Sequence, residues 1–214
     1  MTSPLTVRAR ALGPYQTNAY IVAPEDKSDA WVIDAPFDSE DLVAVLRAEG
    51  LTPSRVLLTH AHPDHIAGIP ALKAAFPAVR VSLHEAERDW LGEPELNLSA
   101  FMGEPISLPP ADELLREGQE LSLAGHVFRV LHTPGHSPGG VTFWCEGLNL
   151  AFVGDALFAG SIGRTDFPGA DHATLVRSVR EKLYTLPDGA KVLPGHGPRT
   201  TIGREKLSNP FVRA

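Results

Sequence analysis

Residues 55–59 (RVLLT) run directly into residues 60–65 (HAHPDH), and this junction decides the fold. The first stretch is a short apolar run, the pattern of a strand buried on both faces. The second stretch combines histidines with an aspartate. After it, apolar residues recur at helical spacing from Ile66 to Phe76. The sequence therefore predicts a strand, a ligand-rich turn and a helix, in that order.

The side chains of this turn are of the types that bind divalent transition metals. Imidazole nitrogens and carboxylate oxygens suit Zn²⁺ and Fe²⁺. The turn offers more donors than one tetrahedral zinc ion with an open coordination position can use. They are His60, His62, Asp64 and His65. The turn therefore predicts two neighbouring metal ions.

Three later turns repeat this form at the ends of apolar runs. Each carries one ligand-type residue, His136, Asp155 or His196, with Gly or Pro beside it. Gly permits close approach of the backbone, and loops on a rigid scaffold often carry function. We expect these strand ends to converge on one edge of the fold. Asp155 alone could instead cap a helix or form a turn.

The rest of the chain alternates strand and helix patterns. Strands are predicted over residues 5–11, 18–22, 30–33, 79–83, 120–122, 126–131, 140–145, 150–153 and 191–193. Helices are predicted from the N-cap Ser39 to Gly50 and over residues 171–186, with a loop-rich excursion over residues 94–110. This order predicts an α/β protein of two similar halves, sheet against sheet with helices outside, in one domain of residues 1–214.

The composition of the 214 residues, 43% apolar and 21% charged, is that of an ordinary globular protein. It excludes disordered, collagen-like and coiled-coil classes. No stretch approaches the ~18 consecutive apolar residues of a membrane helix, and the N-terminus lacks the apolar region of a signal peptide. We therefore expect a cytoplasmic protein with no membrane partner. A net charge of −7 without a basic tract disfavours nucleic acid as a partner.

A single cysteine, Cys145, excludes an internal disulfide and a thiolate zinc site. It lies in the apolar run VTFWC, which predicts a buried small side chain rather than a nucleophile. Some histidines lie outside the ligand-rich turns, and we expect these to be surface or hydrogen-bonded residues. They are His84, His126, His132 and His172. Any metal site must therefore use nitrogen and oxygen donors, and such a site with an open position is typical of catalysis.

Longer stretches around these turns resemble one protein family. They are residues 17–20 (TNAY), 33–34 (ID), 59–68 (THAHPDHIAG), 132–140 (HTPGHSPGG), 152–171 (FVGDALFAGSIGRTDFPGAD) and 193–211 (LPGHGPRTTIGREKLSNPF). Over nearly the whole chain, the sequence resembles the metallo-β-lactamase-fold hydrolases. Within them it is similar to the short bacterial glyoxalase II-like, or hydroxyacylglutathione hydrolase-like, proteins. The metal motifs are those of the superfamily, and the GRTDF and PGHGP…NPF segments point to this branch.

The resemblance implies a four-layer αβ/βα sandwich with two metal ions at its open edge. Zn²⁺ is expected, with Fe or Mn as alternatives. The implied ligands are His60, His62 and His136 for one ion, Asp64, His65 and His196 for the other, and Asp155 as a bridge together with a water or hydroxide. The implied catalytic residues are Asp64 and Asp155, acting with the metal-bound hydroxide.

Arg164 stands where relatives place a basic group for the carboxylate of the substrate. A guanidinium there could pair with a carboxylate through two hydrogen bonds. The alternative is an arginine in a surface turn, or an ion pair with Asp166. Glyoxalase II enzymes also carry a C-terminal helical domain that helps to hold glutathione, whereas residues 197–214 alone follow His196 here. The sequence therefore does not determine whether the thiol of the substrate is glutathione or another thiol.

From these features and the resemblance, we predict a binuclear zinc hydrolase. Its substrate would be a small-molecule thioester, such as an S-2-hydroxyacyl derivative of a low-molecular-weight thiol. Zinc lowers the pKa of bound water to about 7, so a hydroxide nucleophile exists at neutral pH. A metal can also polarise the carbonyl and stabilise the oxyanion. A thiolate is a good leaving group, so no dedicated general acid is needed.

Two alternatives remain open on the sequence. The first is a mononuclear iron persulfide dioxygenase, whose facial triad would be His60, His136 and Asp155. Against it, residues 194–197 read PGHG rather than the P-A-H-D-Y type of ending that such relatives show. The second is a non-catalytic metal-binding module, whose signature would be missing ligands, and none is missing. The oligomeric state is not determined by the sequence.

Overall fold

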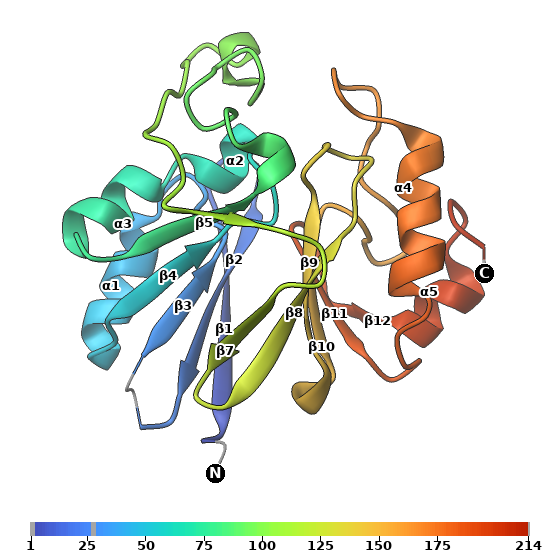
Figure 1. The fold of residues 1–214 in the computed structure, drawn as a ribbon, viewed down its shortest axis with the longest axis horizontal. Coiled ribbons are helices and arrows are strands. Elements are labelled where there is room, and N and C mark those ends of the chain that lie inside the picture. The colour runs from blue at the N-terminus through green and yellow to red at the C-terminus, as the bar shows by residue number, and fades with distance from the viewer. Residues whose placement is uncertain (1–2, 27–28, 214) are drawn as a thin grey trace. The chain divides into compact units, whose positions relative to one another are not determined.

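The structure, a computed structural model, describes residues 3–26 and 29–213. The chain forms two units (Figure 1). The N-terminal unit comprises Met1–Leu115 with Ser122–His126, and the C-terminal unit comprises Arg116–Leu121 with Val127–Ala214. Figure 1 colours the first mainly blue to green and the second mainly yellow to red. Each unit carries part of the predicted ligand set.

A mixed sheet of six strands forms the N-terminal unit, in the order β1-β2-β3-β4-β5-β6. The strands are β1 (Leu5–Leu12), β2 (Thr17–Pro24), β3 (Ala30–Ile33), β4 (Pro53–Leu57), β5 (Arg80–His84) and β6 (Glu113–Leu115). β1 to β3 pair antiparallel, and β3 to β6 pair parallel. Because β3 and β4 run in the same direction, their carboxyl ends share one edge of the sheet. Asp34 and the 60–65 turn follow these two ends. The strands predicted here are confirmed, but the strand expected over residues 55–59 is β4 (Pro53–Leu57), so residues 58 and 59 separate it from His60; β6 is additional.

Helix α1 (Glu40–Glu49) lies where the sequence predicts it. Gly50 ends it with a φ of 67°, in the left-handed region that glycine tolerates best. Ser39 occupies the N-cap position, but its hydroxyl donates to the carbonyl of Pro36 at 2.7 Å and makes no capping hydrogen bond. The boundary of the helix is therefore right, and the expected capping contact is wrong.

The single helix predicted after the ligand turn is two helices, α2 (Pro63–Ile66) and α3 (Ile69–Ala75). The break lies at Gly68, which is packed so closely that a Cβ there would lie 2.0 Å from Ser39 Oγ. The N–H of Gly68 donates to the carbonyl of Ala35 at 2.8 Å, and Pro70 in the first turn of α3 has no N–H to donate back to Ile66. The helix therefore ends and restarts here, although the apolar periodicity is continuous.

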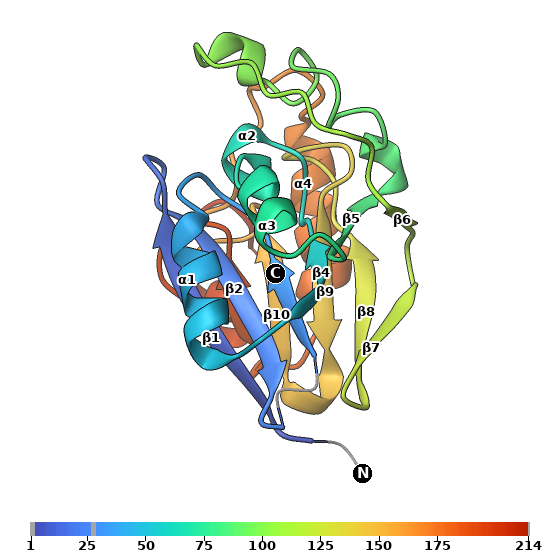
Figure 2. The same cartoon turned by 90° about the vertical axis from the view of Figure 1, so that its left-hand side faces the viewer.

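The loop-rich excursion predicted over residues 94–110 is confirmed, and it contains one 3₁₀ turn, Ser99–Phe101. The buried side chain of Asn97 holds it to the rest of the unit, because Asn97 Nδ2 donates to the carbonyl of Trp90 at 2.9 Å. Figures 1 and 2 both show this segment rising beyond α2.

The second sheet is also mixed, with its six strands in the order β12-β11-β10-β9-β8-β7. They are β7 (Glu120–Leu123), β8 (His126–His132), β9 (Val141–Cys145), β10 (Leu150–Gly154), β11 (Lys191–Pro194) and β12 (Thr200–Thr201). β10 pairs parallel with β11, and β9 pairs antiparallel with both β8 and β10. β8, β10 and β11 therefore run in one direction, and their carboxyl ends lead at one edge to His136, Asp155 and His196. β12 has no counterpart in the prediction.

Helix α4 (His172–Ser178) is capped by Asp171, whose carboxylate accepts the N–H of Thr174 at 2.7 Å. The predicted helix then continues as a π-helical turn, Val179–Leu183. Helix α5 (Ile202–Ser208), near the C-terminus, was not predicted.

Each unit has its own apolar core. In the N-terminal unit, Leu46 and Leu72 are fully buried with Val32 of the sheet. In the C-terminal unit, Leu175 is fully buried with Val192. Complete burial of one such side chain contributes roughly 1.5–3 kcal/mol, so each sheet edge rests on a rigid support. Within residues 3–26 and 29–213, no helix has the length and apolar character to cross a membrane.

Candidate metal centre

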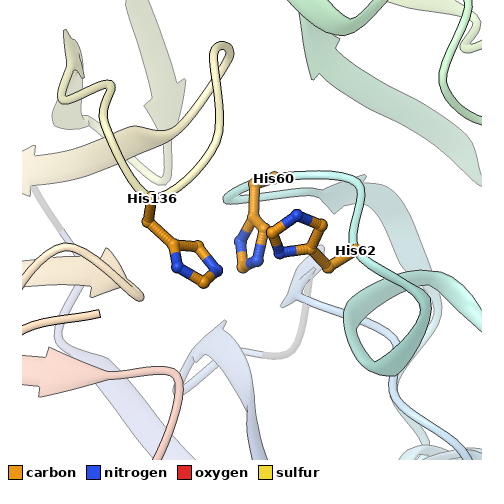
Figure 3. Close-up of side chains that lie close together, drawn as sticks. All are labelled: His60, His62 and His136. Atoms are coloured by element: carbon orange, nitrogen blue, oxygen red, sulfur yellow. The ribbon is translucent and has the colours of Figure 1, made fainter. Parts of the chain in front are cut away.

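The ligand turn of the N-terminal unit, residues 60–65, follows β4 and runs into α2: His60 and His62 precede the helix, and Asp64 and His65 lie in its first turn. Its histidines are almost completely buried, with exposed fractions of 2% for His60, 4% for His62 and 0% for His65. The centroid of the His60 ring lies 4.6 Å from that of His62 and 4.1 Å from that of His65. Figure 3 shows the His60 and His62 rings on this turn. The turn therefore gathers its imidazoles at one point inside the unit.

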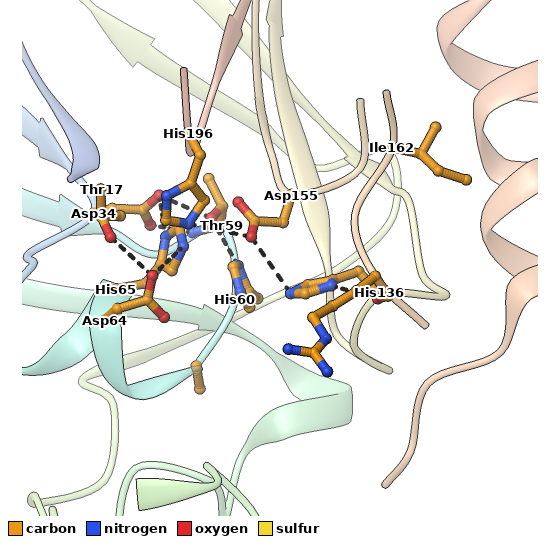
Figure 4. Close-up of polar contacts among 12 residues, drawn as sticks. Thr17, Asp34, Thr59, His60, Asp64, His65, His136, Asp155, Ile162 and His196 are labelled. Atoms are coloured by element: carbon orange, nitrogen blue, oxygen red, sulfur yellow. Dashed lines mark hydrogen bonds and ion pairs between the residues drawn. The ribbon is translucent and has the colours of Figure 1, made fainter. Parts of the chain in front are cut away.

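Asp34 anchors this turn (Figure 4). Its carboxylate accepts the N–H of Thr59 at 2.7 Å, the hydroxyl of Thr59 at 2.8 Å and Nδ1 of His65 at 2.9 Å. Thr59 Oγ1, which donates to Asp34, lies 3.1 Å from His60 Nδ1 and accepts from it. Both rings then carry the proton on Nδ1 and the lone pair on Nε2, the tautomer of a metal ligand. Asp34 has a φ of 59°, a strained value for a non-glycine residue.

The rest of the turn is held by side chains on other elements. Thr17 Oγ1 donates to Asp64 Oδ2 at 2.8 Å, and His65 Nε2 lies 3.5 Å from the same oxygen. The N–H of Ala61 donates to Oε2 of the fully buried Glu87 at 2.7 Å. Hydrogen bonds from other elements thus hold both the side chain of Asp64 and the backbone of the turn.

The C-terminal unit carries its candidate ligands on three separate turns. Asp155 Oδ2 lies 3.6 Å from His136 Nε2 and 3.4 Å from His196 Nε2. His136 Nδ1 donates to the carbonyl of Arg164 at 2.8 Å, so its lone pair also lies on Nε2. Gly135, just before it, has a φ of 128°, and a Cβ there would lie 2.2 Å from the backbone nitrogen of Leu175. Only glycine fits this turn.

These spacings fit metal ligands better than hydrogen bonds. Two nitrogen or oxygen ligands of one tetrahedral zinc, each at about 2.0–2.1 Å from it, lie roughly 3.4 Å apart. The contacts at 3.4, 3.5 and 3.6 Å match this separation and exceed the usual hydrogen-bond length. One Asp155 oxygen faces two imidazole nitrogens, as a bridging carboxylate would. The donor set of each unit therefore fits divalent ions.

The side chain of Arg164 is exposed and already paired. Its Nε and Nη2 donate to the two carboxylate oxygens of Asp166, both at 2.6 Å. Its guanidinium carbon lies 4.1 Å from the ring centroid of Phe167. The hydrogen bonds with Asp166 raise the pKa of Arg164. The structure thus shows the ion pair that the sequence offered as the alternative to substrate binding.

The remaining histidines and the cysteine behave as predicted. His126 Nε2 bonds the carbonyl of Ser3 at 2.9 Å, and His132 Nε2 bonds that of Pro138 at 2.8 Å. The other two are His84, whose Nδ1 accepts the N–H of Ala86 at 3.3 Å, and His172, which is exposed. Burial raises the pKa of the Cys145 thiol, which disfavours a thiolate nucleophile.

Sequence reasoning missed the groups that hold the ligands. Asp34 had a usable signal, because it follows an apolar strand directly, as Asp155 does. The carbonyl of Arg164 gave no sequence signal. Every residue has a backbone carbonyl, and only the folded structure shows which one lies next to His136. Glu87 lies in a 3₁₀ turn, Glu85–Glu87, with no motif around it.

A family model described as the metallo-beta-lactamase superfamily matches residues 12–196. The chain belongs to this superfamily. Its fold is accordingly the metallo-β-lactamase fold, an α/β sandwich of two mixed sheets flanked by helices, as predicted. The superfamily and the relatives below make this protein a metal-dependent hydrolase.

Two curated relatives match almost end to end. The chain is 38% identical over 206 residues to a probable metallo-hydrolase, YqgX, of Bacillus subtilis, covering 96% of each chain. It is also 38% identical over 208 residues to the hydroxyacylglutathione hydrolase GloC of Haemophilus influenzae, covering 94% of each.

Two solved structures share this fold over nearly the whole chain. The structure titled BLEG-1 B3 metallo-beta-lactamase is 44% identical, with a TM-score of 0.93 over 98% of this chain and 100% of that one. The structure titled TTHA1623 in a di-iron-bound form is 41% identical, with a TM-score of 0.84 over 96% of this chain and 100% of that one.

Proposed function

We propose that residues 1–214 form one domain whose two ligand sets build a single binuclear metal centre. The first ion would be held by nitrogen donors and the second by nitrogen and oxygen donors, with one bridging carboxylate. The proposed ligands are His60, His62 and His136, then Asp64, His65 and His196, with Asp155 as the bridge. The observation that supports this best is the single Asp155 oxygen at 3.6 and 3.4 Å from two imidazole nitrogens.

We infer that the reaction is hydrolysis of a thioester, with an S-2-hydroxyacyl derivative of a low-molecular-weight thiol as the substrate class. The similarity to a hydroxyacylglutathione hydrolase supports this choice. Zn²⁺ is the proposed metal, and iron is the alternative, supported by the di-iron-bound form of a similar solved structure. Divalent ions supply Lewis acidity and a water-derived nucleophile at neutral pH.

The chain's own residues prepare the site for this chemistry. Asp34, through its contacts with Thr59 and His65, fixes two rings in one tautomer. The carbonyl of Arg164 does the same for His136. Because these groups are already oriented, little reorganisation is needed during the reaction. The leaving thiolate requires no proton donor, which suits a site whose carboxylates, Asp64 and Asp155, are proposed as catalytic ligands.

Arg164 is proposed to bind the carboxylate of the substrate by exchanging Asp166 for it. The pairing at 2.6 Å shows that the guanidinium presents the two-pronged geometry that a carboxylate needs. Its exposed position allows exchange, because water screens a surface ion pair and leaves the pairing weak.

The test is metal analysis of protein purified without added metal, together with substrate assays. Two zinc ions per chain and cleavage of S-lactoylglutathione are expected. Oxygen uptake with glutathione persulfide and one iron per chain would instead identify a dioxygenase. Preferential cleavage of a β-lactam would identify a lactamase, the activity named for the solved structure of the BLEG-1 protein. Metal binding with none of these activities would contradict a catalytic role in these reactions.

A further inference from the structure

A fully buried carboxylate, Glu205, lies on α5 outside the proposed ligand set. Three groups donate to it: Thr200 Oγ1 to Oε1 at 2.6 Å, and the N–H of Gly160 and Asn209 Nδ2 to Oε2 at 2.8 and 2.9 Å. Burying a carboxylate is costly unless hydrogen bonds compensate for lost hydration. Such a saturated arrangement fixes the positions of its donors.

Asn209 and Glu205 together hold a tight turn. Asn209 Nδ2 also donates to the carbonyl of Ser161 at 3.0 Å. Phe158 and Ser161 exchange backbone hydrogen bonds at 2.9 and 3.3 Å, and Gly160 between them has a φ of 73°. Glu205 and Asn209 therefore bind two backbone groups of the 158–161 turn, the N–H of Gly160 and the carbonyl of Ser161.

This turn leads directly to the candidate metal ligands of the same unit. A Cβ on Gly163 would lie 2.0 Å from the carbonyl oxygen of Asp155 and 3.0 Å from His136 Nδ1, so this segment packs tightly on both. The backbone carbonyl of the next residue, Arg164, accepts a hydrogen bond from His136 Nδ1 at 2.8 Å. At the other end, the Phe158 ring lies edge-on to His196, with centroids 6.0 Å apart.

We propose that Glu205 is a positioning residue for the metal centre. With Asn209 it fixes residues 158–164, so that the Arg164 carbonyl holds His136 with Nε2 directed at the metal. The inference rests on the proposed function, because it needs His136 to be a ligand. It also gives a role to the REKLSNPF segment, which the ligand assignment leaves unused.

The test compares three variants by zinc affinity, measured by competition with a chromogenic chelator. Glu205→Met keeps the side-chain volume but removes both acceptors, so zinc binding should weaken about 10-fold, as for loss of other outer-shell groups. Glu205→Gln should restore most of the affinity. Its oxygen can accept from Gly160 and Asn209, and its amide can donate to the Thr200 hydroxyl.

Tyr184→Phe is the matched structural control. Tyr184 donates to the carbonyls of Glu205 and Val212 at 3.1 and 2.9 Å, and does not contact the 158–161 turn through these bonds. Burial, together with the charge of Glu205, raises the pKa of Tyr184 to about 12, so the hydroxyl stays protonated at neutral pH. This variant should lower Tm and leave zinc affinity unchanged. The visible spectrum of the cobalt-substituted protein should change in Glu205→Met alone.

The outcomes separate the two proposals. Failure of the unmodified protein to bind zinc or cobalt would overturn the proposed function. Normal zinc binding by the unmodified protein with equal affinity in Glu205→Met would overturn the positioning role alone. An equal loss of affinity in Tyr184→Phe at matched loss of Tm would do the same. Should Glu205→Met not fold, Asn209→Ala removes the bond to Ser161, and unchanged zinc affinity there would also overturn the role.

Discussion

The two units present their candidate ligands in opposite ways. The N-terminal unit places His60, His62, Asp64 and His65 in one turn, anchored by the buried carboxylate of Asp34. The C-terminal unit draws one ligand from each of three turns and orients His136 with a backbone carbonyl. The first arrangement is local in sequence. The second exists only because β8, β10 and β11 run in the same direction.

The two arrangements also differ in burial. The three histidines of the N-terminal turn are at most 4% exposed, whereas the side chain of Asp64 is 16% exposed. In the C-terminal unit, the side chain of His196 is 28% exposed and that of Asp155 is 9% exposed. We therefore expect the candidate ligands of the N-terminal unit, where Asp34 accepts several hydrogen bonds, to be held more firmly. The positions of the candidate ligands in the C-terminal unit should depend more on the packing of distant residues.

The largest effect is expected from Asp34→Ala. It leaves the N–H and hydroxyl of Thr59 and Nδ1–H of His65 without their acceptor, at about 1–3 kcal/mol for each buried group. Zinc affinity should fall up to ~100-fold, with a lower Tm, as measured by chelator competition and thermal unfolding. Asp112→Ala is the control. That carboxylate also accepts a backbone N–H, from Val81 at 2.7 Å, and Val81 lies outside the ligand turn. Equal zinc affinity in both variants would remove Asp34 as the anchor.

A smaller effect is expected from Gly163→Ala in the C-terminal unit. The added Cβ would lie 2.0 Å from the Asp155 carbonyl, so the loop must shift and His136 loses its acceptor. We expect zinc affinity to fall about 10-fold. At Gly92 a Cβ would meet its nearest atom at 3.6 Å, so Gly92→Ala should change little. Unchanged affinity in Gly163→Ala would show that the C-terminal ligands do not depend on this loop.

Arg164→Ala should act on substrate binding rather than on the metal. We expect a higher KM with nearly unchanged kcat, as for loss of uniform binding. Asp166→Asn should lower KM, because the guanidinium loses its competing carboxylate. Both are read from steady-state kinetics with S-lactoylglutathione. A KM that is unchanged in both variants would assign the pair to the surface turn alone.

The smallest effect concerns pH. Hydrogen bonds from Arg164 lower the pKa of Asp166 below its ordinary value. A carboxylate with a depressed pKa keeps its ion pair above that range and loses it only as pH falls through the lowered pKa. Replacing Asp166 by Asn should therefore change KM by the same factor throughout about pH 5–8, since the carboxyl is ionised over this range. A change that disappears towards pH 5 would contradict this.

The sequence predicts the N-terminal part of the site well because its ligands are contiguous and end a buried strand. It also predicts the strands that lead to His136, Asp155 and His196. It fails between α2 and α3, because the apolar periodicity is continuous there although Pro70, which has no N–H, marks the start of a new helix. It also fails to predict α5 and the role of Glu205, because the hydrogen bonds of this side chain join residues far apart in the chain. Such contacts leave no local pattern.

The central claim is that both units contribute to one binuclear centre, and zinc stoichiometry tests it directly. Zinc per chain should be measured by mass spectrometry in the unmodified protein, in Asp64→Ala from the N-terminal unit and in His196→Ala from the C-terminal unit. We expect two zinc ions per chain in the unmodified protein and about one in each variant. Two ions with full activity retained in both variants, or a single ion in the unmodified protein, would contradict it.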